Sequence, residues 1–368
     1  MLPKDETLWE NFLRESTGEK IKVLSLEPIS RDQTYAGGLG NTFFINLETK
    51  DGKKRVVAKI AREGFGREHP EDKARDALWV YRTSNLPRQP KAIAVGSIRG
   101  GRIIPLSSDS EYVVVLEEAE GRSYHLYLGD ILKRGTITND DRRAVLNLSD
   151  YLVEVHSEKK DLPLIYKRHV NELLSHEGIP AVDRHLWKIL SKKQIKEKLG
   201  KEKNELRKDI LELKKSAVEH VDRIEELTHR CSRVHGDYHP FENIRFKTYP
   251  DIFSVIDRSR SDYGEPADDV TAMWINYLNH SLLDEGKYSG KFRELGDLFL
   301  ENYLTNTKDY EILETVQPFF VWRTLVVATP VWYPDTPIDV RNKLLSFAKN
   351  ISKVERFDPK AVNTYLLD

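Results

Sequence analysis

The sequence contains a single cysteine, Cys231, so it can form neither an intramolecular disulfide nor a cysteine-based zinc site. It also lacks a large net charge: 58 Lys and Arg residues against 59 Asp and Glu residues leave a net charge of −1. This balance argues against nucleic acid or an acidic membrane surface as a partner. No apolar run approaches the roughly 18 residues of a membrane-spanning helix, and the polar N-terminus lacks a signal-peptide core. We therefore expect a soluble cytoplasmic protein.

The first part of the chain, from about residue 21 to 118, is rich in predicted strands. Segments such as NTFFINLE, KRVVAKIA and EYVVVLEEA are rich in Val, Ile and Phe, which favours β-structure. The pair Asp51-Gly52 predicts a tight hairpin between two of these strands. Within the same part, EDKARDALWVYRTS predicts a helix whose apolar face carries Ala74, Leu78 and Tyr81.

After Gly121 the pattern becomes helical. DRRAVLNLSDYLVEVHSE has apolar residues at helical spacing, and the Lys- and Glu-rich segment 185–229 predicts an exposed helical hairpin that breaks near Gly200. A chain of 368 residues is long enough for two cores. We expect an α+β protein with an N-lobe over residues 1–118 and a helical C-lobe over residues 119–368.

Two features of the strand-rich part are typical of phosphate binding. In YAGGLGNTFFINL, Gly37, Gly38 and Gly40 lie between strands, where backbone N–H groups can approach a ligand; a plain glycine-rich hairpin is the alternative. Lys59 lies within the apolar strand VVAKIA, where a buried ammonium needs a partner. It either holds nucleotide phosphates or points to solvent from an edge strand.

The stretch VHGDYHPFENIRF carries the strongest candidate site. Asp237 can orient and deprotonate a hydroxyl, and Asn243 offers a neutral oxygen to a metal. Asp257, at the end of the strand FSVID, would complete a magnesium site, because Mg²⁺ prefers oxygen ligands and needs few carboxylates when phosphates are present. Zinc binding by His235 and His239 is disfavoured, because Gly and Pro between them oppose a helix. His235 is instead expected to bond the backbone of the turn.

In this order the motifs resemble those of the aminoglycoside phosphotransferase and choline kinase-like superfamily, over about residues 25 to 280. GGLGN resembles its Gly-Gly-x-Ser-Asn turn, VVLEEAEG its hinge, and LVEVHSEKKD its helix ending in Leu-His. VHGDYHPFENIRF is similar to its His-Gly-Asp-x-x-x-x-Asn loop, and VIDRSRSDYGEPADDV to its Ile-Asp segment followed by Gly-Asp-Pro-x-x-Asp. The resemblance implies a protein-kinase-like fold of two lobes, a small β-rich N-lobe and a larger α-helical C-lobe.

The resemblance also implies site residues. Asp237 would be the catalytic base, Asn243 and Asp257 would hold Mg²⁺, and Lys59 would hold the α- and β-phosphates of ATP. The nucleotide-binding set is Gly37, Gly38, Gly40, Asn41, Lys59 and, through the hinge backbone, Glu117, Glu118 and Ala119. The helix acid that pairs with Lys59 stays open among Glu71, Asp72 and Asp76. Asp269 is expected to tie down the loop after the metal site.

One departure concerns the catalytic loop. The family has four residues between its Asp and its Asn, whereas this chain has the five residues 238–242. We expect the extra residue to bulge the loop. Glu242 then either lies in solvent or adds a carboxylate to the site.

The acceptor substrate has weaker candidates. Trp332 and Tyr333 could stack on a sugar ring or a cation, or could be core aromatics. Arg258 and Arg260 could neutralise an anionic substrate, or could pair at the surface with Asp262, Glu265 or Asp268. Two arginines at this point do not favour polycationic aminoglycosides, so a sugar, polyol or amino alcohol is expected.

The sequence therefore predicts an ATP- and Mg²⁺-dependent kinase acting on a hydroxyl of a small molecule, with no nucleic acid or membrane partner. The alternative is a catalytically impaired, kinase-like pseudoenzyme that binds nucleotide or a protein partner. A protein kinase is disfavoured, because the chain has neither an Asp-Phe-Gly motif nor an activation segment ending in Ala-Pro-Glu. The choice between ATP and GTP stays open.

Overall fold

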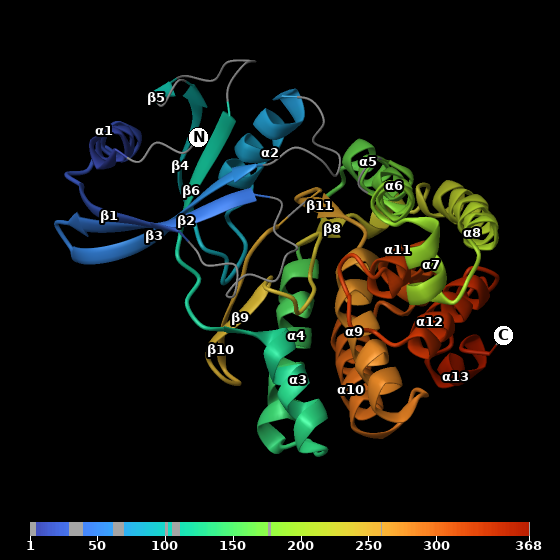
Figure 1. The fold of residues 1–368 in the computed structure, drawn as a ribbon. Coiled ribbons are helices and arrows are strands. Elements are labelled where there is room, and N and C mark those ends of the chain that lie inside the picture. The colour runs from blue at the N-terminus through green and yellow to red at the C-terminus, as the bar shows by residue number, and fades with distance from the viewer. Residues whose placement is uncertain are drawn as a thin grey trace. The chain divides into compact units, whose positions relative to one another are not determined.

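The computed structural model describes residues 5–28, 40–61, 70–99, 102–104, 111–175, 178–258 and 260–367 (Figure 1). The chain forms two compact units. The first comprises Met1–Gly121 and Ser254–Arg258, and the second comprises Arg122–Phe253 and Ser259–Asp368. Within the described ranges, none of the helices combines the length and the apolar character needed to cross a membrane.

The first unit is built on an antiparallel sheet of six strands. Its order is β1-β2-β3-β6-β4-β5, with bounds Lys22–Pro28, Gly40–Thr49, Gly52–Ala61, Glu111–Glu117, Ala92–Arg99 and Arg102–Ile104. The β2–β3 hairpin pairs Thr49 with Gly52, and Gly52 has a left-handed φ of 108°. The expected hairpin at Asp51-Gly52 is therefore confirmed, since this backbone conformation favours glycine.

Helices α1 (Glu6–Thr17) and α2 (Pro70–Thr83) pack against this sheet (Figure 1). Trp9 of α1 is fully buried, and its ring meets that of Phe43 edge to face at 5.1 Å. The predicted helix α2 is confirmed, but two of the residues that share its expected face, Leu78 and Tyr81, are 36% and 40% exposed, whereas Ala77 is buried. Helical spacing alone did not show which side of α2 the strands β4 and β6 would cover.

The second unit is mainly helical (Figure 1). Its helices are α3 Tyr124–Arg134, α4 Asn139–His156, α5 Pro163–Asn171, α6 Ile179–Ile189, α7 Lys192–Leu199, α8 Lys203–Ile224, α9 Ala267–Glu285, α10 Gly290–Thr307, α11 Val316–Ala328, α12 Ile338–Ile351 and α13 Val362–Tyr365. Short strands accompany them: β7 Arg122–Ser123, β8 Ser232–Arg233, β9 Ile244–Thr248, β10 Ile252–Val255, which ends in the first unit, and β11 Tyr263–Gly264. The pairing orders are β10-β9-β7 and β11-β8.

The Lys- and Glu-rich segment forms α7 and α8. Gly200 ends α7 with a left-handed φ of 64°, and its N–H bonds the carbonyl of Lys196. Helix α8 buries one apolar stripe at helical spacing, formed by Leu206, Ile210, Leu213, Ala217, Val221 and Ile224. The charged residues of α8 therefore lie mainly on its other faces.

The predicted α+β fold class is confirmed. Strands dominate the first unit and helices dominate the second, in the expected order along the chain. Two helices of the first unit and eleven of the second are found among the described residues.

Candidate functional site

The loop between β8 and β9 carries the motif His-Gly-Asp and is anchored by a buried carboxylate. Asp269, in the first turn of α9, accepts hydrogen bonds from the backbone N–H groups of His235 at 2.7 Å and Gly236 at 2.8 Å. His156 lies 3.2 Å from the same carboxylate. Asp269 therefore ties down the catalytic-loop candidate, whereas we expected it to tie down the loop after the metal site. His235 Nδ1 accepts from the N–H of Asp237 at 3.2 Å, as expected for a structural histidine.

The loop brings Asp237 and Asn243 together. The Asn243 amide donates to the backbone oxygen of Asp237 at 2.9 Å, and lies 3.4 Å from Asp237 Oδ2. Asn243 is 4% exposed. Because its NH₂ group is used within the loop, its Oδ1 is the atom with capacity to bind a metal.

Asp237 is surrounded by positive charge. Its Oδ1 lies 2.7 Å from Arg323 and 3.4 Å from Arg260, and His239 lies 3.4 Å from its Oδ2. Burial alone raises the pKa of the Asp237 carboxyl, but the charges of His239, Arg323 and Arg260 outweigh burial and hold this pKa well below its ordinary value. Asp237 is therefore ionised across the physiological pH range.

Sequence reasoning missed Arg323 as a site residue, although a signal was present. It is the one charged residue of α11, VQPFFVWRTLVVA. An ionised side chain within an apolar helix requires a buried counter-ion. The structure supplies two, since Arg323 also contacts Asp268 Oδ1 at 2.6 Å.

The extra residue of the loop is accommodated by the backbone of Glu242. Its φ is 62°, a left-handed value that is uncommon for residues other than glycine. The Glu242 N–H donates to Ser123 Oγ at 3.0 Å, and its carboxylate contacts Arg245 at 2.5 Å. The loop thus bulges as expected while the contact between Asp237 and Asn243 is kept.

The bulged loop packs against His125. The imidazole stacks on Phe241 with ring centroids 4.7 Å apart, its Nδ1 lies 2.7 Å from Ser123 Oγ, and its backbone N–H donates to Pro240. Burial, assisted by the charges of His280 and His239, lowers the pKa of His125 to about 4. At neutral pH the ring under the loop is therefore uncharged.

We expect this histidine to make the protein sensitive to mild acid. The pKa of His125 is below its ordinary value of 6.5 in the folded state. The unfolded chain therefore protonates His125 at a higher pH than the folded protein does. As a result, the free energy of unfolding is unaffected by this group above pH 6.5 and falls by ~1–3 kcal/mol as the pH falls towards 4. His125→Gln should flatten the decline of the urea unfolding midpoint between pH 6.5 and 4. Exposed His229, replaced by Gln, is the control; an unchanged decline in His125→Gln would refute this role.

In the first unit, Lys59 and Asp257 form an ion pair. Lys59 Nζ lies 2.6 Å from Asp257 Oδ1, with the side chains 31% and 41% exposed. Strand β3 pairs with both β2 and β6, so the edge-strand alternative for Lys59 was wrong. Among the described side chains, the partner of Lys59 is thus the expected metal carboxylate. Of the three helix candidates, Asp72 and Asp76 lie on α2, and the side chain of Glu71 falls outside the described residues.

The hinge candidates follow β6. The Glu117 N–H donates to the Lys91 carbonyl at 2.9 Å, and its carboxylate accepts from the Lys91 N–H at 3.1 Å. The Glu118 carboxylate accepts from Arg55 Nε at 2.8 Å. The backbone N–H of Glu117 is thus engaged by Lys91.

The glycine-rich turn is described only in part. Gly37 and Gly38 lie outside the described residues, as does the side chain of Asn41. Gly40 begins β2 and pairs with Ala61.

The four weaker substrate candidates have different surroundings. Arg258 is 3% exposed and donates to the Thr83 carbonyl at 2.8 Å, which is a structural role within the first unit. Arg260 contacts Asp268 at 3.2 Å, one of the partners that the surface alternative named, although this contact is buried. Tyr333 donates to Asn276 Oδ1 at 2.9 Å, and Trp332 precedes it, half-buried, in the segment after α11.

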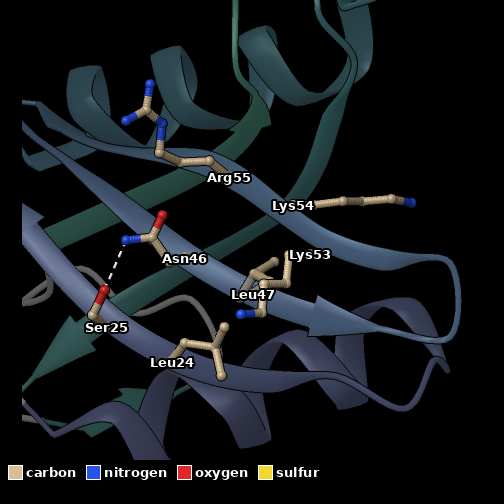
Figure 2. A pocket seen from close by; sticks show the side chains of 7 residues that line it. All are labelled: Leu24, Ser25, Asn46, Leu47, Lys53, Lys54 and Arg55. Carbon is tan, nitrogen blue, oxygen red and sulfur yellow. Dashed lines mark hydrogen bonds between the residues drawn. The ribbon is translucent and has the colours of Figure 1, made fainter.

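Other kinds of site find little support. Burial raises the pKa of the Cys231 thiol to about 11, so this thiol is unreactive at neutral pH. Across the part of the chain that the structure describes, no three His, Cys, Asp or Glu side chains gather closely enough to hold a metal by themselves. Figure 2 shows a shallow hollow on β1, β2 and β3, where Asn46 donates to Ser25 Oγ at 2.7 Å and Lys53, Lys54 and Arg55 line the rim. It contains none of the candidate residues.

No family model matches this chain, and no curated protein does. Several solved structures resemble it. An ethanolamine kinase of Plasmodium vivax is 14% identical, with a TM-score of 0.44 and coverage of 96% of this chain and 82% of that one. A microcompartment-associated aminopropanol kinase is 14% identical, with a TM-score of 0.47 and 99% coverage of both chains. An aminoglycoside phosphotransferase of Streptomyces rimosus is 14% identical, with a TM-score of 0.43 and coverage of 87% and 99%. These scores lie below 0.5, so any assignment of function rests on this chain's own residues.

Proposed function

We propose that this protein is an ATP- and Mg²⁺-dependent phosphotransferase that moves the γ-phosphoryl group to a hydroxyl of a small polar metabolite, a sugar, polyol or amino alcohol. The observation that carries the proposal is the position of the Asp237 carboxylate, beside Arg323 at 2.7 Å. It lies on a loop anchored by Asp269, with Asn243 in contact. Phosphoryl transfer requires mainly positioning and charge neutralisation from a protein, and these residues are suited to both.

Asp237 orients the acceptor hydroxyl and accepts its proton. Lys59 binds the nucleotide phosphates. The amide oxygen of Asn243 and the carboxylate of Asp257 are hard oxygen ligands of the type that suits Mg²⁺, so the residues present fit this ion. Bound Mg²⁺ would neutralise phosphate charge. The remaining nucleotide contacts are those of the glycine-rich turn and the backbone at Ala119.

Calorimetric titration of ATP into the purified protein, with and without Mg²⁺, tests the proposal directly. Binding should require Mg²⁺, and Asp257→Asn should weaken it at least about tenfold, or ~1.4 kcal/mol. Asp257 has a left-handed φ of 58°, a conformation that asparagine also tolerates, so the variant removes charge without changing the backbone. Parallel titration with GTP identifies the donor.

Asp51→Asn is the matched control, because Asn-Gly suits the β2–β3 turn as well as Asp-Gly does. Unchanged affinity in Asp257→Asn would remove this residue from the metal site. Absence of binding in the wild-type protein would favour the pseudoenzyme alternative, whose support is the extra loop residue and the left-handed backbone of Glu242.

A further inference from the structure

We propose that Arg323 is a positioning residue for Asp237: bridging Asp237 to Asp268, it holds the catalytic carboxylate in one orientation and leaves Oδ2 for the acceptor hydroxyl. This inference rests on the proposed function. Arg323 Nη1 lies 2.7 Å from Asp237 Oδ1, and Nη2 lies 2.6 Å from Asp268 Oδ1. The contacts of Asp237 Oδ2 with His239 and Asn243 are longer, at 3.4 Å.

The bridge is built on helices rather than on the loop. Arg323 comes from α11 and Asp268 from the first turn of α9, and these two helices pack against each other. Asp268 is 1% exposed, and the Arg323 side chain is 7% exposed. The loop carboxylate is thus fixed against two rigid, buried elements, which is how a reactive group is held in a narrow range of positions.

A second arginine completes the arrangement. Arg260 reaches Asp268 Oδ2 with Nε at 3.2 Å and Asp237 Oδ1 with Nη2 at 3.4 Å. The ring of Trp322 lies under both guanidinium groups, 4.1 Å from that of Arg323 and 4.5 Å from that of Arg260. The buried carboxylate of Asp268 and the partly exposed carboxylate of Asp237 therefore face two arginines, and the aromatic ring restricts the planes of both guanidinium groups.

The bridge requires the planar guanidinium group of an arginine. The two nitrogens of the Arg323 guanidinium contact different aspartates at once, whereas a lysine ammonium is a single point of charge on a flexible chain. A shift of about 1 Å in a reacting group can cost about 10²-fold in rate. Arg323 also lies 3.4 Å from the Gly236 carbonyl, so it contacts the loop backbone as well as the carboxylate.

The functional test measures phosphate release from Mg·ATP, with water as the acceptor. Arg323→Ala should reduce the rate about 10²-fold while leaving the calorimetric Mg·ATP affinity unchanged. Added guanidinium chloride, at millimolar concentration, should restore part of the rate, because it fills the vacated position with the missing group. Arg323→Lys should remain impaired.

Arg134→Ala is the matched control, because it removes an arginine from the buried carboxylate of Asp141, away from the loop. It should change neither the rate nor the response to guanidinium. An unaltered rate in Arg323→Ala, or a loss that guanidinium does not restore, would overturn the positioning role.

A crystal structure of Arg323→Gln separates this inference from the proposed function, since it needs no turnover. The Asp237 carboxylate should rotate away from the orientation seen here and lose its contact with the Asn243 amide. If the carboxylate keeps its place, the inference is refuted, whatever the activity. If the wild-type protein releases no phosphate although the carboxylate rotates, the proposed function fails and the positioning role stands.

Discussion

Replacing Asp237 by Asn is expected to reduce phosphoryl transfer by about 10²–10⁴-fold, the range of a lost general base, while Mg·ATP binding stays nearly intact. The variant keeps the shape of the side chain but removes the charge that Arg323 and Arg260 face. The hydroxyl of the acceptor then has no carboxylate to accept its proton. ADP release with a panel of sugars, polyols and amino alcohols measures transfer, and calorimetry measures nucleotide affinity.

Asp251→Asn is the control for this variant. Asp251 is an exposed aspartate that pairs with Arg143 at 3.1 Å on the surface of the same unit, and its loss should leave the rate unchanged. If Asp237→Asn lost nucleotide affinity to the same extent as transfer, its role as a base would be excluded. Transfer at the wild-type rate would exclude it as well.

Replacing Arg230 by Met is expected to lower the free energy of unfolding by about 3–5 kcal/mol, because it leaves a buried carboxylate without its counter-ion. Arg230 and Glu265 are 2% and 0% exposed, and they meet through two parallel contacts of 2.8 and 2.7 Å. Burial opposes ionisation of Glu265, but the charge of Arg230 and its hydrogen bonds keep the pKa of this carboxyl below its ordinary value. Without Arg230, burial raises the pKa of Glu265, so the variant must either keep an unpaired charge in the interior or protonate the carboxyl, and both cost stability.

Urea unfolding at pH 7 measures this effect. The double variant Arg230→Met/Glu265→Gln should recover much of the loss, because it removes the stranded charge. Arg143→Met, which breaks exposed pairs only, should cost no more than ~1 kcal/mol. Equal stability of Arg230→Met and Arg143→Met would show that the buried pair contributes no more than a surface pair.

Glu265 also connects this network to the candidate site. It lies two residues before α9, accepts from the backbone N–H of Ala267 at 3.2 Å and bonds Thr315 at 3.2 Å. Helix α9 then presents Asp268 and Asp269 in its first turn. A partial loss of transfer in Arg230→Met is therefore expected to accompany its loss of stability.

Local chemistry made several features predictable. The turn at Asp51-Gly52 needs a φ that only glycine adopts easily, so two adjacent residues were enough to predict it. Asp237 and Asn243 are only six positions apart in one loop, so their spacing could be recognised along the chain. The structural role of His235 could be predicted for the same reason, because the N–H of Asp237 that it accepts from is only two residues away.

Contacts between distant segments could not be predicted in this way. Lys59 and Asp257 are 198 positions apart, and Arg323 and Asp237 are 86 apart. The sequence showed that Lys59 is a charge in an apolar strand and hence needs a partner, but not which carboxylate that partner would be. The same signal at Arg323 was missed. The periodicity of α2 likewise showed a helix but not the side that the sheet would cover.

By itself, then, the sequence determined the order of strands and helices, the catalytic-loop candidate and the need of Lys59 for a partner. Only the tertiary structure decided the partners: Asp257 for Lys59, the pair Asp237 and Asp268 for Arg323, and the loop backbone for Asp269. The physical reason is that desolvation makes a counter-ion obligatory wherever a charge is buried, whereas its identity depends on which segments the folded chain brings together.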